Sequence, residues 1–554
     1  MALRGGPTAR ITGAILGAIA VVAVMATSCK GAGSKDTTGD EGSSGSTVLT
    51  PNKSGGVVTG PADKAPIEGG QIRFAIEAEP EGLDPTRYAF SQAGNTVASA
   101  VFDPLATLDK DGNVVPYLAT GFDHNDDYTV WTIGLPSGVT FHDGTPLTAD
   151  VVVQVLEAYR ASLITGPSVK GIVTSVATKD PTHVEVKTAF PYRYVPGAMA
   201  SQIGYIFAPS MLTNPDLAKK PIGTGPFIID QHEDGRFWKF KKNPGYWRKG
   251  LPHLNAIEFD PIAEDADRLQ KLDKGDVDMI QTIAGQQFAE LRNMKDLKLV
   301  ENRFGDKAFL MLNTTKPPFD NVTARRAVAY ATDSAKWRKD MYADVATPAN
   351  SPYGPNQPGY LTDNGFPQFN PAKAKELVAQ YKQETGNELE FTFLASADVN
   401  NARDAQLFAP AFEAAGMKVK IVQRPQINLL GQVAAGDYQL SQFRLFSNPS
   451  PIVDATFYRS AAIQAISLNF PRYGNPEIDQ AVEKAAGTDD RIKQDPDFQR
   501  ISRIFAEQVP YVWLGQLTWA LAANERVNGV AGAANGTVPT LMPRTWIAEL
   551  SLSS

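Results

Sequence analysis

Few residues of this chain are suited to chemistry. It has five histidines and one cysteine among 554 residues, which leaves little material for a Cys/His metal site or a disulfide framework. His142 and Asp143 stand side by side in the run Phe-His-Asp-Gly-Thr-Pro. The pair could suggest acid–base or metal chemistry, yet it lies in a turn sequence and has no second histidine at metal-ligand spacing. We therefore interpret the pair as part of a structural turn.

Two other runs begin like ligand-binding motifs and fail on their spacing. Asp109–Asn113 starts like a calcium loop, yet the sixth and twelfth positions, which need Gly and Glu, hold Val114 and Thr120. Gly223–Pro226 lacks the Lys-Ser/Thr pair of a phosphate-binding loop. The sequence also has no Gly-x-Ser-x-Gly elbow and no His-Glu-x-x-His motif. We predict a protein that is not an enzyme, with no catalytic residues, no metal site and no cofactor.

The composition is that of an ordinary globular protein. Hydrophobic residues make up 43% and charged residues 20%, and the length suggests about three domains. The single long apolar run lies near the N-terminus, which excludes a protein with several membrane spans. The formal net charge of -7 gives no electrostatic case for binding nucleic acid.

The first residues have the pattern of an export signal. Arg4 and Arg10 precede the uncharged apolar stretch Ile11–Met25, and small residues then lead to the only cysteine, Cys29. We predict a signal peptide over residues 1–28. A lone cysteine after small residues resembles a bacterial lipobox, which implies lipid attachment at Cys29. Ordinary secretion with an incidental cysteine, or an uncleaved membrane anchor, are the alternatives.

The segment after the cysteine has the composition of a flexible tether. Residues 30–65 are rich in Gly, Ser, Thr and Asp and contain no aromatic residue, so they cannot bury enough apolar surface to offset their chain entropy. We assign residues 29–68 to the lipidated cysteine and this linker. An anchor, a tether and a large folded body describe a protein at the extracytoplasmic face of a bacterial membrane.

From Gly70 onward strands, turns and short helices follow one another. Residues 128–135 alternate with the period of a half-buried strand, and Trp131 within them is expected in the core. Thr148 is suited to cap a helix whose first turn holds Asp150. The apolar face of that helix comprises Val151, Val152, Val155, Leu156 and Tyr159.

Residues 389–443 have a different pattern of expected strands and helices, and this pattern indicates a candidate site. Strands are expected at 389–394, 418–423 and 438–443, with helices at 401–415 and 427–435. This β-α-β-α-β order predicts a mostly parallel sheet covered by helices, and ligands of such sheets bind beyond the carboxyl ends of the strands. Those ends are Ala395-Ser396, Arg424-Pro425 and Arg444–Asn448.

Eight short segments in a fixed order point to one family. They are EGLDP at 81–85, VFDPL at 101–105 with PYLA at 116–119, FHDGTPLTADV at 141–151, IGTGPF at 222–227, KNPGYW at 242–247, LNTTKPPF at 312–319, RRAVAYATD at 325–333 and VPY at 509–511. Together they resemble the large extracytoplasmic solute-binding proteins of ABC importers, in the peptide/nickel (oligopeptide- and dipeptide-binding) family.

The resemblance implies an α/β, two-lobed periplasmic-binding-protein fold of the Venus-flytrap, cluster C type. An extra small domain would belong to the first lobe. The implied boundaries are 69–105, 223–305 and 520–554 for the first lobe (domain I), 106–222 for the extra domain (domain II) and 306–519 for the second lobe (domain III). The chain would return to the first lobe near Trp519. Asn313 would be a hinge or core hydrogen-bonding residue, with a ligand contact as the alternative.

The resemblance also implies a function without catalysis. The protein would capture a small solute, an oligopeptide in our interpretation, between its lobes and deliver it to an ABC permease with its ATPase subunits. A ligand shifts such a hinge only by the difference in its affinity for the closed and open states. We expect a monomer. A non-peptide solute such as an oligosaccharide or a metal complex, or a sensing or envelope-assembly role with the same fold, are the alternatives.

Ligand contacts are expected on both lobes. The candidate ligand-binding residues are Tyr88, Phe90, Ser91, Gln92, Arg424, Arg444, Phe446, Ser447 and Asn448. The first four match the position where the family lines its cleft, with a surface turn as the alternative. Arg444 is suited to bind a carboxylate or stack on a ring, and a structural salt bridge is the alternative.

One departure from the family bears on the solute. Peptide binders of the family hold the peptide's amine with an aspartate after the third strand of the second lobe. Residues 444–449 contain no aspartate, and the next is Asp454. Either Asn448 takes an uncharged role or the ligand lacks an ammonium there, because losing a charged partner would change ligand preference. None of the histidines lies beyond His253, so direct ligation of nickel from the second lobe is poorly supported.

Overall fold

A central sheet of 11 strands organises the chain. The computed structural model describes residues 56–109, 113–355, 357–397, 399–446, 450–530 and 545–553. In sheet order the strands are β12 (Phe227–Glu233), β13 (Phe237–Lys242), β14 (Ala256–Pro261), β3 (Gln71–Ile76), β15 (Met279–Thr282), β20 (Tyr511–Asn524), β16 (Leu297–Leu312), β19 (Leu440–Phe446), β17 (Glu390–Ser396) and β18 (Lys418–Arg424), and β1 (Gly56–Thr59) pairs with β16.

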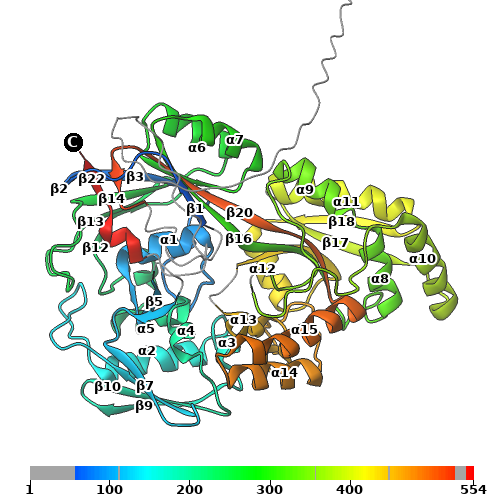
Figure 1. Ribbon diagram of the computed structural model, residues 1–554, viewed down its shortest axis with the longest axis horizontal. Coiled ribbons are helices and arrows are strands. Elements are labelled where there is room, and N and C mark those ends of the chain that lie inside the picture. The colour runs from blue at the N-terminus through cyan, green and yellow to red at the C-terminus, as the bar shows by residue number, and fades with distance from the viewer. Residues whose placement is uncertain are drawn as a thin grey trace, which may run out of the picture. The chain divides into compact units, whose positions relative to one another are not determined.

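Two long strands connect the two halves of this sheet, as Figure 1 shows for β16 and β20. The first half is β12, β13, β14, β3 and β15, and the second half is β19, β17 and β18. The start of β16 up to Asn302 pairs with the end of β20 from Trp519, and the rest of β16 from Asp306 pairs with both β19 and the start of β20. The register shifts between Asn302 and Asp306. We call this break the crossing point.

The second half confirms the β-α-β-α-β prediction. Helix α11 (Val399–Ala414) follows β17 and helix α12 (Gln426–Ala434) follows β18, and β17 runs parallel to both β18 and β19. Ser396 pairs with Arg424 at the end of this register. The carboxyl ends of these strands therefore meet at one edge of the sheet.

Smaller sheets and helices surround the central sheet. A sheet with the order β7 (Gly121–His124), β8 (Val130–Gly134), β10 (His183–Thr188) and β9 (Val173–Asp180) packs on helix α2 (Ala149–Ala161). The short strand sets are β4 (Asp103–Pro104) with β11 (Tyr205–Ile206), β5 (Ala106–Leu108) with β6 (Val114–Pro116), and β2 (Pro66–Ile67) with β22 (Ser551–Ser553) and β21 (Val527–Asn528).

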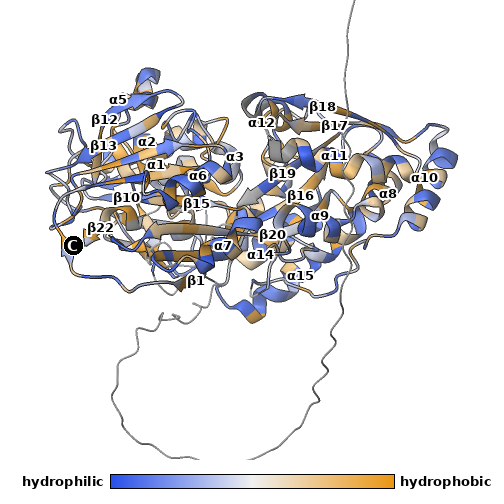
Figure 2. Ribbon diagram, turned by 90° about the horizontal axis from the view of Figure 1, so that it is seen from above, coloured by the Kyte–Doolittle hydropathy of each residue, from blue (hydrophilic) through white to orange (hydrophobic). Residues whose placement is uncertain are grey.

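The remaining helices lie on these sheets or connect them. They are α1 (Gln92–Val101), α3 (Gly166–Val169), α4 (Val195–Met199), α5 (Ser210–Thr213), α6 (Asp265–Asp273), α7 (Gly285–Asn293), α8 (Val322–Ala331), α9 (Ser334–Tyr342), α10 (Pro371–Thr385), α13 (Pro451–Asp454), α14 (Pro476–Ala486) and α15 (Arg491–Gln508). Figure 2 shows hydrophilic and hydrophobic residues together on α10, as expected of a helix with one buried face.

Local sequence signals act as expected in this fold. The Thr148 side chain accepts a hydrogen bond from the amide of Val151 and caps α2, whose predicted apolar face is buried. Trp131 is buried, as predicted for the core. Asn313 is fully buried and donates to the carbonyls of Gly436 and Tyr438, which confirms it as a core hydrogen-bonding residue.

The His142 turn and the Gly223–Pro226 turn are one structural unit. Nε2 of His142 hydrogen-bonds the carbonyl of Gly225 at 3.0 Å, and burial lowers the pKa of His142. A Cβ atom at Gly223 would lie 2.1 Å from the carbonyl oxygen of Val101, so only glycine fits against the end of α1. Both turns therefore have the structural role that their sequences predict.

Asp103 gives the fold a measurable pH dependence. Its carboxylate accepts hydrogen bonds from the side chains of Thr224, Tyr246 and Trp247, yet burial outweighs them and raises the pKa of Asp103 to about 6. The folded state therefore holds a proton that the unfolded state has released between about pH 4 and pH 6, so stability falls as pH rises through this range.

We expect Asp103→Asn to remove that contribution. The difference in unfolding free energy between wild type and variant, measured with denaturant, should change by about 2–3 kcal/mol from pH 4 to pH 7. The variant loses stability at every pH because Asn cannot accept all three hydrogen bonds. The prediction therefore concerns only how the difference in unfolding free energy changes with pH. The same difference in unfolding free energy at pH 4 and at pH 7 would contradict the prediction.

Candidate functional site

The predicted loop at the start of α1 is held firmly in place. The Phe90 ring is buried against Tyr205, with 6.3 Å between centroids, and the Ser91 side chain caps α1 by accepting from the amide of Gly94. Gln202 donates to the carbonyl of Tyr88 at 2.7 Å, and Tyr88 is half-buried. Phe90 and Ser91 thus have structural contacts of their own.

Gln92 differs from its neighbours in this loop. It is the first residue of α1 and its side chain is 1% exposed, yet its Oε1 atom has no hydrogen-bond partner among the described residues. Oε1 of Gln281, on β15, is also buried without a hydrogen-bond partner among the described residues. Nε2 of the same side chain lies 3.4 Å from the hydroxyl of Thr96 on α1. Buried polar atoms without partners are rare and call for a physical reason.

The predicted residues of the second half divide between the two faces of the sheet. Arg424 is exposed at the end of β18. Arg444 lies opposite Ala308, whereas Lys307 lies opposite Leu445, so Arg444 and Lys307 point to opposite faces. The guanidinium of Arg444 is 3.8 Å from the buried carboxylate of Asp306, which is the structural salt bridge named above as the alternative.

Four predicted residues have little or no structural description. Phe446 is the last residue of β19. Ser447 and Asn448, like the predicted lipid-attachment residue Cys29, lie outside the described residues.

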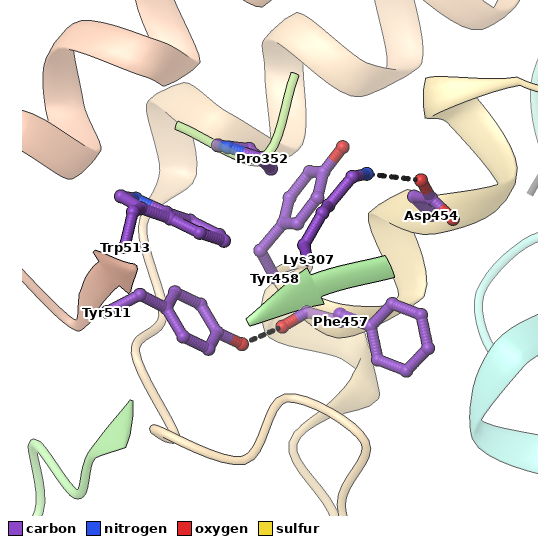
Figure 3. Close-up of a pocket in the computed structure, with 7 residues that line it drawn as sticks. All are labelled: Lys307, Pro352, Asp454, Phe457, Tyr458, Tyr511 and Trp513. Atoms are coloured by element: carbon purple, nitrogen blue, oxygen red, sulfur yellow. Dashed lines mark hydrogen bonds and ion pairs between the residues drawn. The ribbon is translucent and has the colours of Figure 1, made fainter. Parts of the chain in front are cut away.

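A small pocket opens on the Lys307 face of the second half, next to the crossing point (Figure 3). It is lined by Lys307, Pro352, Asp454, Phe457, Tyr458, Tyr511 and Trp513. The ammonium of Lys307 lies 2.9 Å from Oδ2 of Asp454, and both side chains are about nineteen-twentieths buried. The cavity volume of about 20 Å³ holds little more than one water molecule.

Aromatic rings form the walls of this pocket. Tyr511 and Trp513 lie two residues apart on β20 with their ring centroids 5.2 Å apart, and the hydroxyl of Tyr511 donates to the carbonyl of Phe457 at 2.9 Å. Burial raises the pKa of both Tyr511 and Tyr458, so their hydroxyls stay protonated. Lys307 and Asp454 are therefore the charged groups among the seven lining residues.

Strand β20 carries further polar groups that sequence reasoning did not nominate. Nε1 of Trp513, both amide atoms of Gln516 and Nε1 of Trp519 are buried and have no hydrogen-bond partner among the described residues. Trp519 pairs with Asn302 at the crossing point. The sequence Tyr-Val-Trp-Leu-Gly-Gln-Leu-Thr-Trp, at 511–519, was the available signal, because it places amide and indole groups on an otherwise apolar strand.

The segment that carries Asp454 also contacts the part of the chain around the four-stranded sheet. Arg459 donates to the carbonyl of Lys170 at 3.3 Å, and Val453 packs near Gly197. Farther along, Arg193 pairs with Asp489 at 2.9 Å. The segment that carries Asp454 therefore touches parts of the chain that are distant in sequence.

The fold is that of a two-lobed α/β protein, and the two halves of its central sheet are joined by strands β16 and β20. Residues 113–462 match the sequence profile of the bacterial extracellular solute-binding proteins, family 5 (middle region). The chain belongs to this family. The resemblance and the two-lobed fold class predicted from the sequence are thereby confirmed. The domain boundaries remain a prediction.

Curated relatives are similar along most of their length. The chain is 26% identical over 492 residues to a di/tripeptide-binding protein of Pseudomonas aeruginosa, covering 83% of this chain and 92% of the relative. It is 25% identical over 470 residues to a glutathione-binding protein of Pectobacterium atrosepticum, covering 82% and 90%. The family and these relatives are binding proteins.

Solved structures share the fold. A periplasmic binding protein of Helicobacter pylori in complex with the peptide STSA has a TM-score of 0.78 at 20% identity, covering 88% of this chain and 99% of its own. A binding protein of A. tumefaciens in complex with agropinic acid has a TM-score of 0.79 at 22% identity with the same coverage. Within the described part of this chain, no helix has the length and apolar character needed to cross a membrane.

Proposed function

We propose that this chain is the receptor of an ABC importer and binds short peptides between its two lobes. The observation that carries the proposal is the buried Lys307–Asp454 ion pair in an aromatic pocket beside the crossing point. A permease and its ATPase subunits would receive the loaded protein. The peptide-binding relatives and the peptide-bound structure with this fold support this choice of solute.

The ion pair suits a ligand that carries both charges. Without a ligand, Lys307 and Asp454 neutralise each other. A peptide with free ends offers an ammonium to Asp454 and a carboxylate to Lys307, so both protein charges keep a partner when the pair separates. Asp454 then takes the amine-binding role that the residues just after β19 lack. A ligand with one end capped would leave one buried charge unpaired.

The unpartnered groups on β20 suit the peptide backbone. Trp513 and Trp519 offer indole N–H donors, and Gln516 offers both a donor and an acceptor. Gln92 and Gln281 of the first half add side-chain carbonyl oxygens. A bound peptide would satisfy polar atoms that otherwise stay buried without hydrogen bonds.

The size of the pocket requires movement on binding. A cavity of about 20 Å³ cannot hold a peptide, so the solute enters when the two halves separate about β16 and β20. The ligand then stabilises the closed arrangement by the contacts it makes only there.

The remaining sequence predictions belong to the same proposal. The lobes follow the boundaries 69–105, 223–305 and 520–554 for domain I, 106–222 for domain II and 306–519 for domain III. The protein acts as a monomer at the extracytoplasmic face of the membrane, held by a lipid on Cys29 through the tether at 29–68.

Capped peptides provide the test. We would record thermal unfolding of the full chain in detergent with a pool of tripeptides, and with the same pool N-acetylated or C-amidated. At about 100 times its dissociation constant, a free tripeptide should stabilise the protein by roughly 2.7 kcal/mol, and either cap should abolish the shift. Equal shifts with capped peptides would overturn the zwitterion proposal. A shift with sugars or opines alone would overturn the peptide solute and leave the family assignment intact.

A further inference from the structure

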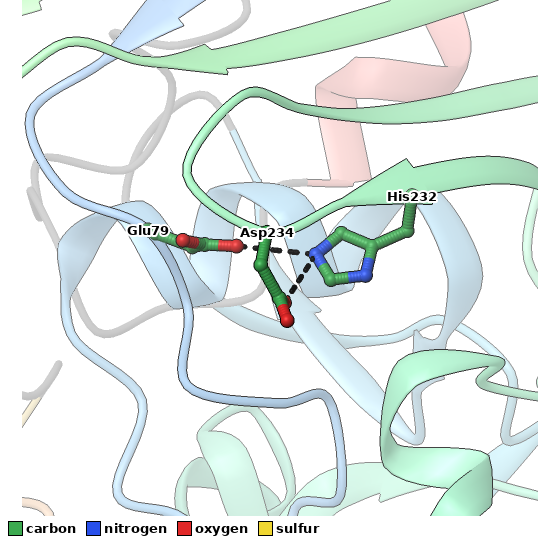
Figure 4. Close-up of side chains that lie close together, drawn as sticks. All are labelled: Glu79, His232 and Asp234. Carbon is green, nitrogen blue, oxygen red and sulfur yellow. Dashed lines mark hydrogen bonds and ion pairs between the residues drawn. The ribbon is translucent and has the colours of Figure 1, made fainter.

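A second candidate site lies on the first half of the sheet, away from the pocket. Figure 4 shows Glu79, His232 and Asp234 converging there. Nε2 of His232 is 3.1 Å from Oε1 of Glu79 and 3.4 Å from Oδ1 of Asp234, and the three ligand atoms all lie within 4.8 Å of one another. His232 belongs to β12, Asp234 to the turn before β13, and Glu79 to the loop after β3.

We propose that these three side chains bind a divalent first-row transition-metal ion. An imidazole nitrogen and carboxylate oxygens are suitable ligands for such ions. With metal–ligand bonds of about 2.0–2.2 Å, neighbouring ligand atoms in tetrahedral or octahedral sites stand about 2.8–3.6 Å apart. The distances from Nε2 to the two carboxylates therefore already match those of a coordination sphere.

Two of the three ligands are held in place by groups outside the coordination set. The His232 ring lies on the buried Trp238 ring, with 3.7 Å between centroids, and its side chain is 10% exposed. The second oxygen of Glu79 accepts the amide of Gly235 at 2.7 Å. Ligands oriented in this way bind metals better because less freedom is lost on binding.

The charges of the site call for a cation. Nε2 faces two carboxylate oxygens, so a bare nitrogen lone pair there would be repelled, and a proton or a metal ion must lie between them. Lys219 supplies one positive charge, because its ammonium is 2.8 Å from Oδ1 of Asp234 and lowers the pKa of that carboxyl, with a smaller contribution from His232. Asp234 is 79% exposed, so water can reach the remaining coordination positions.

The metal would join two parts of the first half that are distant in sequence. Glu79 begins the segment that leads to Gln92 at the start of α1, and the other two ligands belong to the β12–β13 hairpin. The same segment is also held at Leu83, whose amide donates to the carbonyl of Ala218 next to Lys219. Metal binding would thus stiffen the segment that precedes the predicted solute contacts of the first lobe.

Zinc titration tests this proposal. The full chain, purified in detergent without a histidine tag and freed of metal with a chelator, would be titrated with Zn²⁺ by calorimetry. Asp234→Asn and His232→Asn should each weaken binding at least about tenfold. Lys219→Gln should tighten it several-fold, because it removes the competing cation. Asp234 is exposed in a turn, so its variant keeps the fold even if His232→Asn does not.

His253 provides the matched control. Its Nδ1 lies 2.6 Å from a carboxylate oxygen of Glu68, which is a histidine–carboxylate pair outside the three-ligand cluster. His253→Asn should bind Zn²⁺ as the wild type does. If the wild type and Asp234→Asn bind equally, or if His253→Asn loses the binding instead, the site is wrongly assigned.

Discussion

Asp454→Asn is expected to lower the free energy of unfolding by about 3–5 kcal/mol. The substitution removes the negative charge that lies 2.9 Å from the buried ammonium of Lys307, in a pocket whose other walls are aromatic or apolar. An unpaired buried charge costs far more than the net stabilisation that the pair provides, so the loss greatly exceeds the contribution of the ion pair itself. Denaturant unfolding of the full chain in detergent measures it.

The double variant Lys307→Met/Asp454→Leu separates charge from packing. Replacing both partners by apolar residues should restore most of the stability, because neither charge is left behind. Peptide binding should be lost in the single and the double variants alike. Lys316→Met is the control, since its pair with Asp437 is largely exposed and should contribute less than about 1 kcal/mol. A double variant as unstable as Asp454→Asn would contradict this account.

Gly285→Ala is expected to destabilise the protein by about 1–3 kcal/mol and to weaken solute binding. Gly285 begins α7, and a Cβ atom built there would lie 1.9 Å from the carbonyl oxygen of Tyr342 at the end of α9. Helix α7 packs on β16 and β20, while α9 belongs to the segment that follows β16. Alanine therefore forces these two helices apart behind the crossing point, which disturbs the closed arrangement that binds the solute.

Gly431→Ala is the matched control for this prediction. Gly431 lies inside helix α12, and a Cβ atom placed there would have no atom within 4 Å, so alanine should raise stability by up to about 1 kcal/mol through helix propensity. Denaturant unfolding and calorimetric titration with tripeptide measure both effects. Equal stability of the Gly285→Ala variant and the wild type would contradict the prediction. It would show that α7 and α9 can move apart without loss of folding free energy.

The regular part of the fold could be predicted from the sequence because its signals are local. The predicted strand at 418–423 is observed as β18 (Lys418–Arg424), and the helix at 427–435 as α12 (Gln426–Ala434). Hydrophobic period and turn residues determine such elements over a few neighbouring positions. The prediction that Thr148 caps α2 is confirmed for the same reason.

The candidate site could be predicted only in part because it is built from distant residues. Parallel pairing does bring Ser396 and Arg424 to one edge, as the rule for α/β sheets requires. The pocket, however, combines Lys307, Asp454 and Trp513, whose proximity depends on where the register of β16 and β20 breaks. The sequence predicts that Arg444 follows a strand, but the face of the sheet on which Arg444 lies is determined by its pairing with Ala308.

The position of β20 has a consequence for how the protein is made. β20 lies between β15 and β16, although it is one of the last strands of the chain, and β22 at 551–553 pairs with β2 near the start. Until β20 has been synthesised, β15 and one side of β16 are unpaired strand edges. Such edges readily pair with other chains. These edges are covered only after β20 has been synthesised. A ribosome that stops before Tyr511 releases a polypeptide that lacks the strand joining β15 of the first half to β16.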